Sequence, residues 1–392
     1  MIEKIKTLAK QYANEFIDIR HHLHANPELS YQEFETSKFV QGKLKEFGIP
    51  FEVKATTGVV GLIKGKNPDK RVIAIRADMD ALPIKEENDV PYKSNNEGVM
   101  HACGHDVHTT CLLGASKILN ELKAEWEGTV KLIFQPGEER NPGGASIMIK
   151  DGVLENPRPA AIFAMHVHPG LELGKLSFRG GKVMASADEL YFTIKGKGGH
   201  AASPHLCIDP ILIASQLIIS LQQLISRNND PFNPSVLSIT SIQGGNTTNV
   251  IPNEVKLLGT FRAMNEEWRF KAHDLIRKQA TDLVHSMGGK IDLHIDVGYP
   301  AVHNNEQLNE IAKKIAGEYL GTDNVEETEL RMGAEDFGYY AQQIPACFYR
   351  VGVMNKEKGI VSGVHTPTFN IDEDAIETGI GMMAWLGASV KF

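Results

Sequence analysis

The order of predicted strands and helices changes once along the chain, and this change constrains the fold more than any other feature. After helices expected at about 2–24 and 31–47, short β-branched or apolar runs alternate with helical stretches such as 109–122. Such alternation predicts a largely parallel sheet covered by helices on both faces. The expected strands cover residues 59–63, 71–77, 130–134 and 160–165.

From about residue 187 the pattern becomes strand, helix, strand, strand, helix, strand. This β-α-β-β-α-β order is the split βαβ unit of a ferredoxin-like α+β domain. Glycines at 180–181 and 298 bracket it, and the segment after 304 returns to helix and strand. We therefore predict an α/β domain made of 1–181 and 298–392, with a second domain, 182–297, inserted into it.

Composition favours a small-molecule partner. The chain has 392 residues, enough for two cores, and 41 Lys and Arg against 49 Asp and Glu give a net charge of −8. This balance argues against a nucleic-acid or anionic-membrane partner. No segment reaches the roughly 18 apolar residues of a membrane span, and the first ten lack a signal-peptide core. Four scattered cysteines fit a reducing compartment, so we expect a cytoplasmic protein.

Residues 101–108, HACGHDVH, place three imidazoles, a thiol and a carboxylate at the start of an apolar helix. These are side chains that bind zinc, manganese or cobalt. Asp78 and Asp80 follow one predicted strand, Glu138 and Glu139 follow another, and His166 ends a third. The carboxyl ends of parallel strands share one edge of a sheet, so these groups are expected to meet there.

A water shared by two metals can act as a nucleophile near neutral pH. Of the adjacent Glu138 and Glu139, one carboxylate can bind metal while the other serves as general base. Other groups have plainer explanations. A solvated helix face accounts for His21, His22 and His24, packing accounts for Cys111, Cys207 and Cys347, and supporting or structural roles are expected for His101 and His108.

Five motifs together resemble the M20 metallopeptidase family, most closely its amidohydrolase branch, which includes aminoacylases, hippurate hydrolases and auxin-conjugate hydrolases. The resemblance spans nearly the whole chain and implies a zinc-peptidase-like catalytic domain with an inserted lid and dimerisation domain. Gly137 departs from it, because many members have alanine there. The motifs are HHLH with NPE at 21–28, RADMDALP at 76–83, MHACGHD at 100–106, QPGEE at 135–139 and GAEDF at 333–337.

The resemblance implies two divalent metal ions per subunit, zinc or manganese, with cobalt and nickel as further candidates. It implies that Glu138 is the general base and that Asp80 orients a ligand. In the inserted domain it implies that His200 stabilises the oxyanion, either within one subunit or across a dimer interface, and that Asn249 and Arg262 hold the substrate carboxylate. The implied ligands are Cys103, His105, Glu139, His166 and His365.

The expected activity is metal-dependent hydrolysis of the amide bond of an N-acyl-amino acid, by a homodimer joined through the inserted domain. A dipeptidase or carboxypeptidase with the same metals is the nearest alternative. A thiol hydrolase with Cys103 as nucleophile, and a metal-binding protein that is not an enzyme, are the alternatives from other classes.

Overall fold

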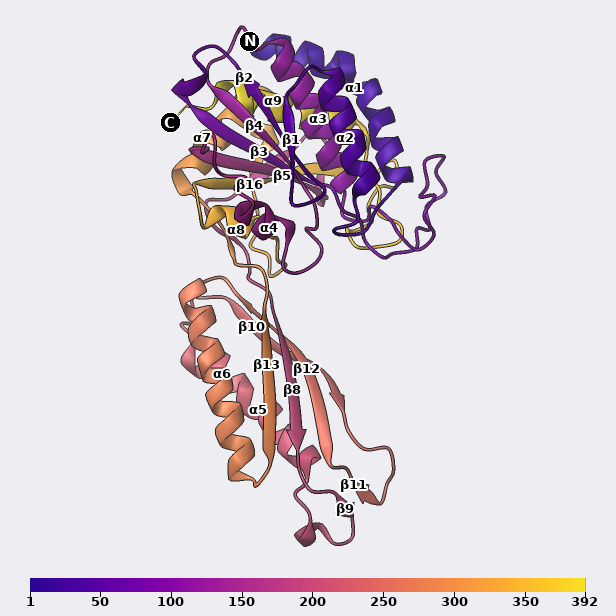
Figure 1. Cartoon of the computed structure of the whole chain (residues 1–392), viewed down its shortest axis with the longest axis vertical. Coiled ribbons are helices and arrows are strands. Elements are labelled where there is room, and N and C mark those ends of the chain that lie inside the picture. Colours follow the sequence, from indigo (N-terminus) through magenta and orange to yellow (C-terminus); the bar gives the residue numbers. More distant parts are fainter. Residues whose placement is uncertain (392) are drawn as a thin grey trace. The chain divides into compact units, whose positions relative to one another are not determined.

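The computed structural model describes residues 1–391 and divides into two compact units (Figure 1). The first comprises Met1–Gly181, His303–Glu329 and Asp336–Phe392. The second comprises Lys182–Val302 and Leu330–Glu335. Two short strands, β7 (Gly181–Met184) and β14 (Val302–Asn304), lie where the chain passes between the units.

An eight-stranded sheet forms the centre of the first unit, in the order β1-β2-β4-β3-β5-β16-β6-β15. Its four middle strands are parallel, and the antiparallel pairs are β1 with β2, β2 with β4, and β16 with β6. The predicted mostly parallel sheet is therefore confirmed. The strands are β1 (Phe51–Lys54), β2 (Gly58–Lys64), β3 (Val72–Asp78), β4 (Thr129–Gln135), β5 (Ala161–Glu172), β6 (Leu176–Phe178), β15 (Val325–Glu327) and β16 (Ala346–Met354).

Helices α3 (His105–Glu121) and α9 (Asp374–Ser389) pack against each other and against the sheet, and α1 (Ile2–Ala25) packs on both (Figure 1). Every residue of α3 from His105 to Ser116 is buried, which explains its apolar sequence. This sandwiched position makes α3 a rigid base for the groups at its first turn. The other helices of the unit are α2 (Phe34–Glu46), α4 (Gly144–Lys150), α7 (Glu306–Leu320) and α8 (Gly338–Ala341).

Three predicted boundaries need correction. Helix α3 begins at His105 rather than near residue 109, and α2 begins at Phe34 because Tyr31 has a left-handed φ of 68°. His166 does not end its strand, since β5 continues to Glu172 and pairs with β16 beyond it. The apolar run stops near His166, but strand pairing does not depend on apolar side chains.

The second unit has the predicted β-α-β-β-α-β order. Its antiparallel sheet has the order β10-β12-β8-β13, and its two long helices pack on that sheet through a separate apolar core. A two-stranded ribbon, β9 (Gly199–His200) with β11 (Val250–Ile251), lies apart from this sheet (Figure 1). The elements are β8 (Asp188–Lys195), α5 (Pro210–Gln223), β10 (Ser235–Gln243), β12 (Glu254–Ala263), α6 (Glu266–Ser286) and β13 (Lys290–Val297).

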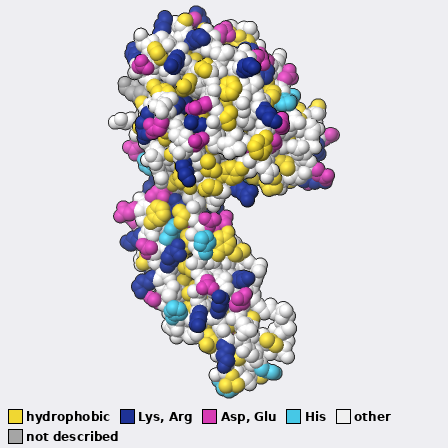
Figure 2. Space-filling model, viewed as in Figure 1, with side chains coloured by type: hydrophobic (Ala, Val, Ile, Leu, Met, Phe, Trp, Pro, Cys, Tyr) yellow, Lys and Arg dark blue, Asp and Glu magenta, His cyan; other side chains and the backbone are white. Residues whose placement is uncertain are grey.

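Figure 2 shows acidic and basic side chains interspersed over the visible face, without a continuous basic patch there. Among residues 1–391, no helix combines the length and apolarity needed to cross a membrane.

A buried ion cluster ties the elements of the second unit together. Asp188, at the start of β8, accepts hydrogen bonds from Arg269 Nε at 2.9 Å and from His273 Nε2 at 2.7 Å, both on α6. Burial opposes ionisation of Asp188, but the bonds from His273 and Arg269 outweigh it and lower the pKa of this carboxyl below 3.8.

Asp188→Asn is expected to lower the free energy of unfolding by roughly 3 kcal/mol at pH 7, because the buried Arg269 would keep only the partly exposed Glu266 as a charge partner. A carboxyl whose pKa is lowered by folding stabilises the protein above its ordinary pKa of 3.8 and loses that contribution as the pH falls. The difference between wild type and variant should therefore shrink below about pH 4. Denaturant unfolding across pH 3–8 measures it, and a constant difference would contradict this account.

Candidate metal centre

Gly104 separates Cys103 from His105 and turns the chain into helix α3. Its φ is +86°, and a Cβ there would overlap Val167, so this position favours glycine on both grounds. Cys103 precedes the helix and His105 is its first residue, and both are buried. The turn brings the thiol and the imidazole to the same side of the sheet edge.

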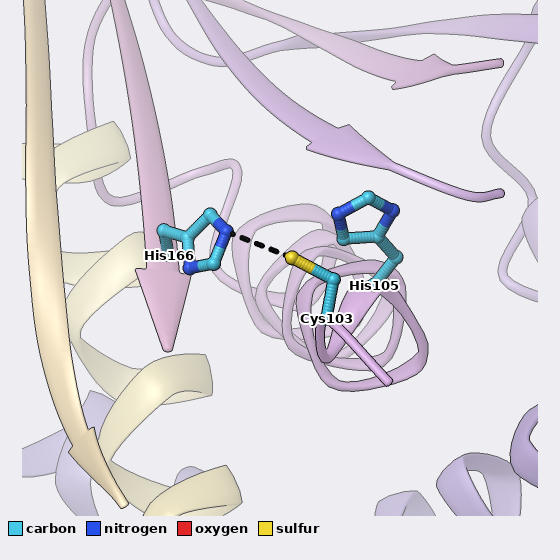
Figure 3. Close-up of side chains that lie close together, drawn as sticks. All are labelled: Cys103, His105 and His166. Carbon is cyan, nitrogen blue, oxygen red and sulfur yellow. Dashed lines mark hydrogen bonds between the residues drawn. The ribbon is translucent and has the colours of Figure 1, made fainter. Parts of the chain in front are cut away.

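The hydrogen bonds of two histidines fix which ring nitrogen is free. Because a carbonyl oxygen only accepts, Nδ1 of His105 donates to the Asp80 carbonyl at 2.9 Å, and Nδ1 of His166 donates to the Val167 carbonyl at 2.7 Å. Each neutral ring then has its lone pair on Nε2. Nε2 of His166 lies 3.4 Å from Cys103 Sγ (Figure 3), and the buried Nε2 of His105 has no hydrogen-bond partner among residues 1–391.

A second group shares the same thiol. His365 Nε2 lies 3.3 Å from Cys103 Sγ and 3.2 Å from Glu139 Oε1. His365 is held in a left-handed conformation, and its N–H donates to the Ala102 carbonyl at 2.7 Å. Cys103, His105 and His166 thus form one group, and Cys103, Glu139 and His365 form another, each with its ligand atoms within 4.8 Å of one another.

The charge balance of these groups suits a bound cation. Burial disfavours a charged His105, but the Asp78 carboxylate and the Cys103 thiol outweigh it and raise its pKa. Hydrogen bonds to Cys103 and then to Glu139 raise the pKa of His365 to about 10. The centre therefore attracts positive charge, and thiolate, imidazole and carboxylate donors fit zinc and related divalent ions.

Glu138 lies beside both groups. Its Oε2 is 3.9 Å from His105 Nε2, and its Oε1 accepts a long hydrogen bond from the Asp336 N–H at 3.4 Å. The side chain is nearly buried, at 6% exposure. Adjacent Glu138 and Glu139 follow β4 through a turn at Gly137, where φ is +60°. The two carboxylates therefore reach the same centre from one loop.

Asp80 connects the ligands of the two groups. Its Oδ1 lies 3.2 Å from His105 Nδ1, and its Oδ2 accepts hydrogen bonds from Ser30 Oγ at 2.6 Å and from the Glu139 N–H at 2.9 Å. These bonds, outweighing its burial, lower the pKa of Asp80 and favour its ionised form. Asp80 is thus placed to orient His105 and the Glu139 loop together.

His108 and His101 differ in their surroundings. Nε2 of His108 accepts the Val167 N–H at 2.9 Å, and its Nδ1 bonds to Asp78 at 2.6 Å, so neither nitrogen is free for a metal. His101 is buried, and burial lowers its pKa to about 4. Neither ring nitrogen of His101 has a hydrogen-bond partner, and this side chain belongs to none of the ligand groups found among residues 1–391.

In the second unit, His200 and Asn249 lie side by side. His200 pairs with Val250, and the Ala201 N–H donates to the Asn249 carbonyl at 3.0 Å. The Ala202 N–H donates to His200 Nδ1 at 3.0 Å, so the neutral ring carries its proton on Nε2 and can donate from there. His200 is exposed to solvent.

Arg262 lies in the four-stranded sheet, away from the ribbon that carries His200. It is near the end of β12, whereas the ribbon that carries His200 joins the beginning of β12 at Glu254. The eight steps from Glu254 to Arg262 span roughly 26 Å at about 3.3 Å per residue. Arg262 Nε donates to Thr260 Oγ1 at 3.1 Å, and burial lowers the pKa of its guanidinium. One copy of this unit therefore does not bring His200 and Asn249 together with Arg262.

Comparison with known proteins decides the family. The model of peptidase family M20/M25/M40 matches residues 74–386, most of the chain. The chain belongs to this family. The resemblance predicted from the motifs, and with it the class of metallo-amidohydrolases, is confirmed.

Two curated relatives and one solved structure illustrate which proteins this M20-family hydrolase is similar to. The IAA-amino acid hydrolase ILR1-like 4 of Arabidopsis thaliana is 42% identical, over 97% of this chain and 87% of its own. Thermostable carboxypeptidase 2 of Saccharolobus solfataricus is 38% identical, over 100% and 99%. The Bacillus subtilis YXEP protein, described as a dinuclear metal binding peptidase, is 36% identical with a TM-score of 0.83 and 97% and 98% coverage.

Sequence reasoning missed a buried network beside the M20-family motifs. His24 is not on a solvated face, since its exposure is 1% and its Nδ1 bonds to Asp106 at 2.8 Å. Arg20, also buried, donates from Nε to the same carboxylate at 2.9 Å. Both residues lie on the helix face of Phe16 and Leu23, and that helical spacing was the signal available in the sequence.

Proposed function

We propose that the protein hydrolyses the amide bond of N-acyl-amino acids, releasing a carboxylate and a free amino acid. The observation that carries this proposal is the thiol shared by two ligand groups, with the Glu138 carboxylate next to both. The relative named as an IAA-amino acid hydrolase supports the substrate class. In this account residues 1–181 and 298–392 form the catalytic domain, and 182–297 form the lid.

Five residues would hold two divalent ions. Zinc and manganese are the first candidates, and cobalt and nickel are the second. When bound, the ions would polarise the amide carbonyl and lower the pKa of a water molecule. Asp80 keeps His105 and the Glu139 loop in place through its hydrogen bonds. The proposed ligands are Cys103, His105, Glu139, His166 and His365.

Glu138 is proposed to move the proton. Its carboxylate accepts a proton from the attacking water and passes it to the nitrogen of the leaving amino acid. The nearly buried position of Glu138 limits solvation of the carboxylate and so strengthens its interaction with the reacting groups. Its long bond from the Asp336 N–H leaves one oxygen restrained and the other directed toward His105.

The substrate carboxylate is assigned to Arg262 and Asn249, and the developing oxyanion to Nε2 of His200. Because His200 lies in the ribbon beside the beginning of β12 and Arg262 lies near the end of β12, we propose that a second copy supplies His200 and Asn249. The protein would then act as a homodimer joined through the lid.

Mixing two inactive variants tests this arrangement. In a heterodimer of Glu138→Gln and His200→Ala, one site has both residues intact only if His200 acts across the interface. The mixture is expected to recover about a quarter of wild-type activity, since half of the dimers are mixed and each has one complete site. Light scattering should show a dimer. A mixture as inactive as its components, or a monomer at assay concentration, would contradict the arrangement.

A dipeptidase or carboxypeptidase with the same metals is the second candidate, favoured by the thermostable carboxypeptidase relative. A panel of N-acetyl- and N-aroyl-amino acids assayed beside dipeptides and blocked peptides separates the two. We expect kcat/KM to be at least about tenfold higher for the N-acyl-amino acids. A preference for dipeptides would mean that the second candidate, not N-acyl-amino acid hydrolysis, is the activity.

We also propose a cytoplasmic location, because all four cysteines are free thiols, as expected in a reducing compartment.

A further inference from the structure

The loop that carries Glu138 and Glu139 is tied to a short segment between helices α1 and α2. Glu33 is fully buried, and its Oε1 accepts a hydrogen bond of 2.8 Å from the N–H of Gly137. Gly137 directly precedes Glu138 in the chain. The Glu33 carboxyl also accepts the Tyr31 N–H and the Thr57 hydroxyl, both at 2.8 Å. No lysine or arginine is among these partners, so hydrogen bonds rather than an ion pair hold the loop.

Tyr31 ties down the rest of the loop. Its hydroxyl donates to the Arg140 carbonyl at 2.5 Å and accepts the Gly143 N–H at 3.0 Å. Its ring lies directly over Gly137, where an added Cβ would overlap Cε1 of the ring. The loop is closed on itself by the Gly144 N–H, which donates to the Gly137 carbonyl at 2.9 Å.

We propose that Tyr31 and Glu33 form a clamp that fixes residues 137–144 and thereby sets the position of the Glu138 carboxylate. They are positioning residues, because neither is among the ligand groups and both act through the loop. This inference rests on the proposed role of Glu138 as general base. It also explains why this chain has glycine at 137: the tyrosine ring occupies the space that an alanine methyl group would need.

The clamp depends on acceptor atoms more than on charge. Burial and then the nearby Asp80 carboxylate raise the pKa of Glu33 to about 7, so the group is only partly ionised at neutral pH. A glutamine can place its oxygen toward Tyr31 and Gly137 and donate its amide N–H to Thr57. Glu33→Gln should therefore preserve the clamp, whereas Glu33→Ala removes all three hydrogen bonds.

Glu28 provides a matched control. It also accepts three hydrogen bonds, from the N–H groups of Glu35 and Thr36 and from the Thr36 hydroxyl, but none comes from the loop of Glu138. Glu28→Ala should lower the melting temperature and leave kcat unchanged. Any effect of Glu33→Ala on kcat that Glu28→Ala lacks belongs to the clamp.

The test measures kcat, KM, metal content, and deuterium exchange of peptides covering 136–145 in the metal-loaded full chain. Glu33→Ala is expected to retain two metal ions, lose about 10²-fold in kcat with KM within about threefold, and exchange faster in these peptides. Glu33→Gln should stay within about threefold of wild type in kcat. If Glu33→Ala does not fold, Tyr31→Phe is measured in the same way and should lose about tenfold in kcat.

Wild-type kcat and exchange in folded Glu33→Ala would overturn the clamp, as would an equal loss of kcat in Glu28→Ala. A failure of the proposed function would give a different result from a failure of the clamp. In that case wild-type protein loaded with metal hydrolyses no N-acyl-amino acid, while faster exchange of 136–145 in Glu33→Ala still supports the clamp.

Discussion

A Glu138→Gln variant is expected to bind both metal ions and to lose hydrolysis of N-acyl-amino acids by about 10²–10⁴-fold. Glutamine has nearly the shape of glutamate, so the Glu139 ligand and the Asp336 N–H keep their places. The amide cannot accept the proton of the attacking water. Metal analysis of the purified variant and initial rates at saturating substrate measure the two parts of this prediction.

Two results would contradict this role for Glu138. Loss of one metal ion on substitution would make Glu138 a ligand, a possibility the structure raises because Glu138, His105 and Glu139 also lie within 4.8 Å of one another. Activity within about threefold of wild type would mean that another group accepts the proton. Unfolding curves of variant and wild type control for a general loss of structure.

Cys103→Ala should have the second large effect, because both ligand groups include this thiol. Changing a residue that merely supports a ligand already weakens metal binding by about 10–100-fold, so removing a shared ligand should exceed about 10²-fold. We expect the variant to purify with fewer than two ions per subunit and without measurable hydrolysis. Titration with zinc or manganese, followed by competition with a chelator, measures the change in affinity.

Cys111→Ala is the matched control for this substitution. Cys111 lies within α3, is fully buried in the apolar core, and its Sγ donates a long hydrogen bond of 3.9 Å to the Ile376 carbonyl. It should lose about 1 kcal/mol of stability and keep both ions. If Cys103→Ala retained two ions and lost only activity, the thiol would be the nucleophile, and the thiol-hydrolase alternative would replace the metal account.

The sequence predicted the mostly parallel sheet, and it placed two acidic pairs correctly at or just after the ends of strands of that sheet, whereas His166 lies within its strand rather than at its end. Asp78 and Gln135 end two adjacent buried strands and pair with each other, so parallel pairing brings the residues that follow them to one edge without further information. The order of elements also predicted the second unit, whose strand order follows from the split βαβ pattern.

The hydrogen-bond partners of the individual site residues could not be predicted from the sequence. Nothing in the pattern around His108 shows that Asp78 and the Val167 N–H occupy both of its nitrogens, while His105 keeps one free. Those differences depend on where Asp80 and β5 lie in space. The contacts of Tyr31 and Glu33 could not be predicted either, because they join segments about 100 residues apart through backbone groups that carry no sequence signal.

The most direct test of the central claim is hydrolysis of an N-acyl-amino acid as a function of metal bound per subunit. The protein is stripped with a chelator, its metal content is measured, and zinc or manganese is returned in defined steps. We predict no activity in the metal-free protein and a rise in activity that ends at two ions per subunit. Full activity of the metal-free protein, or saturation without any bound ion, would contradict the account.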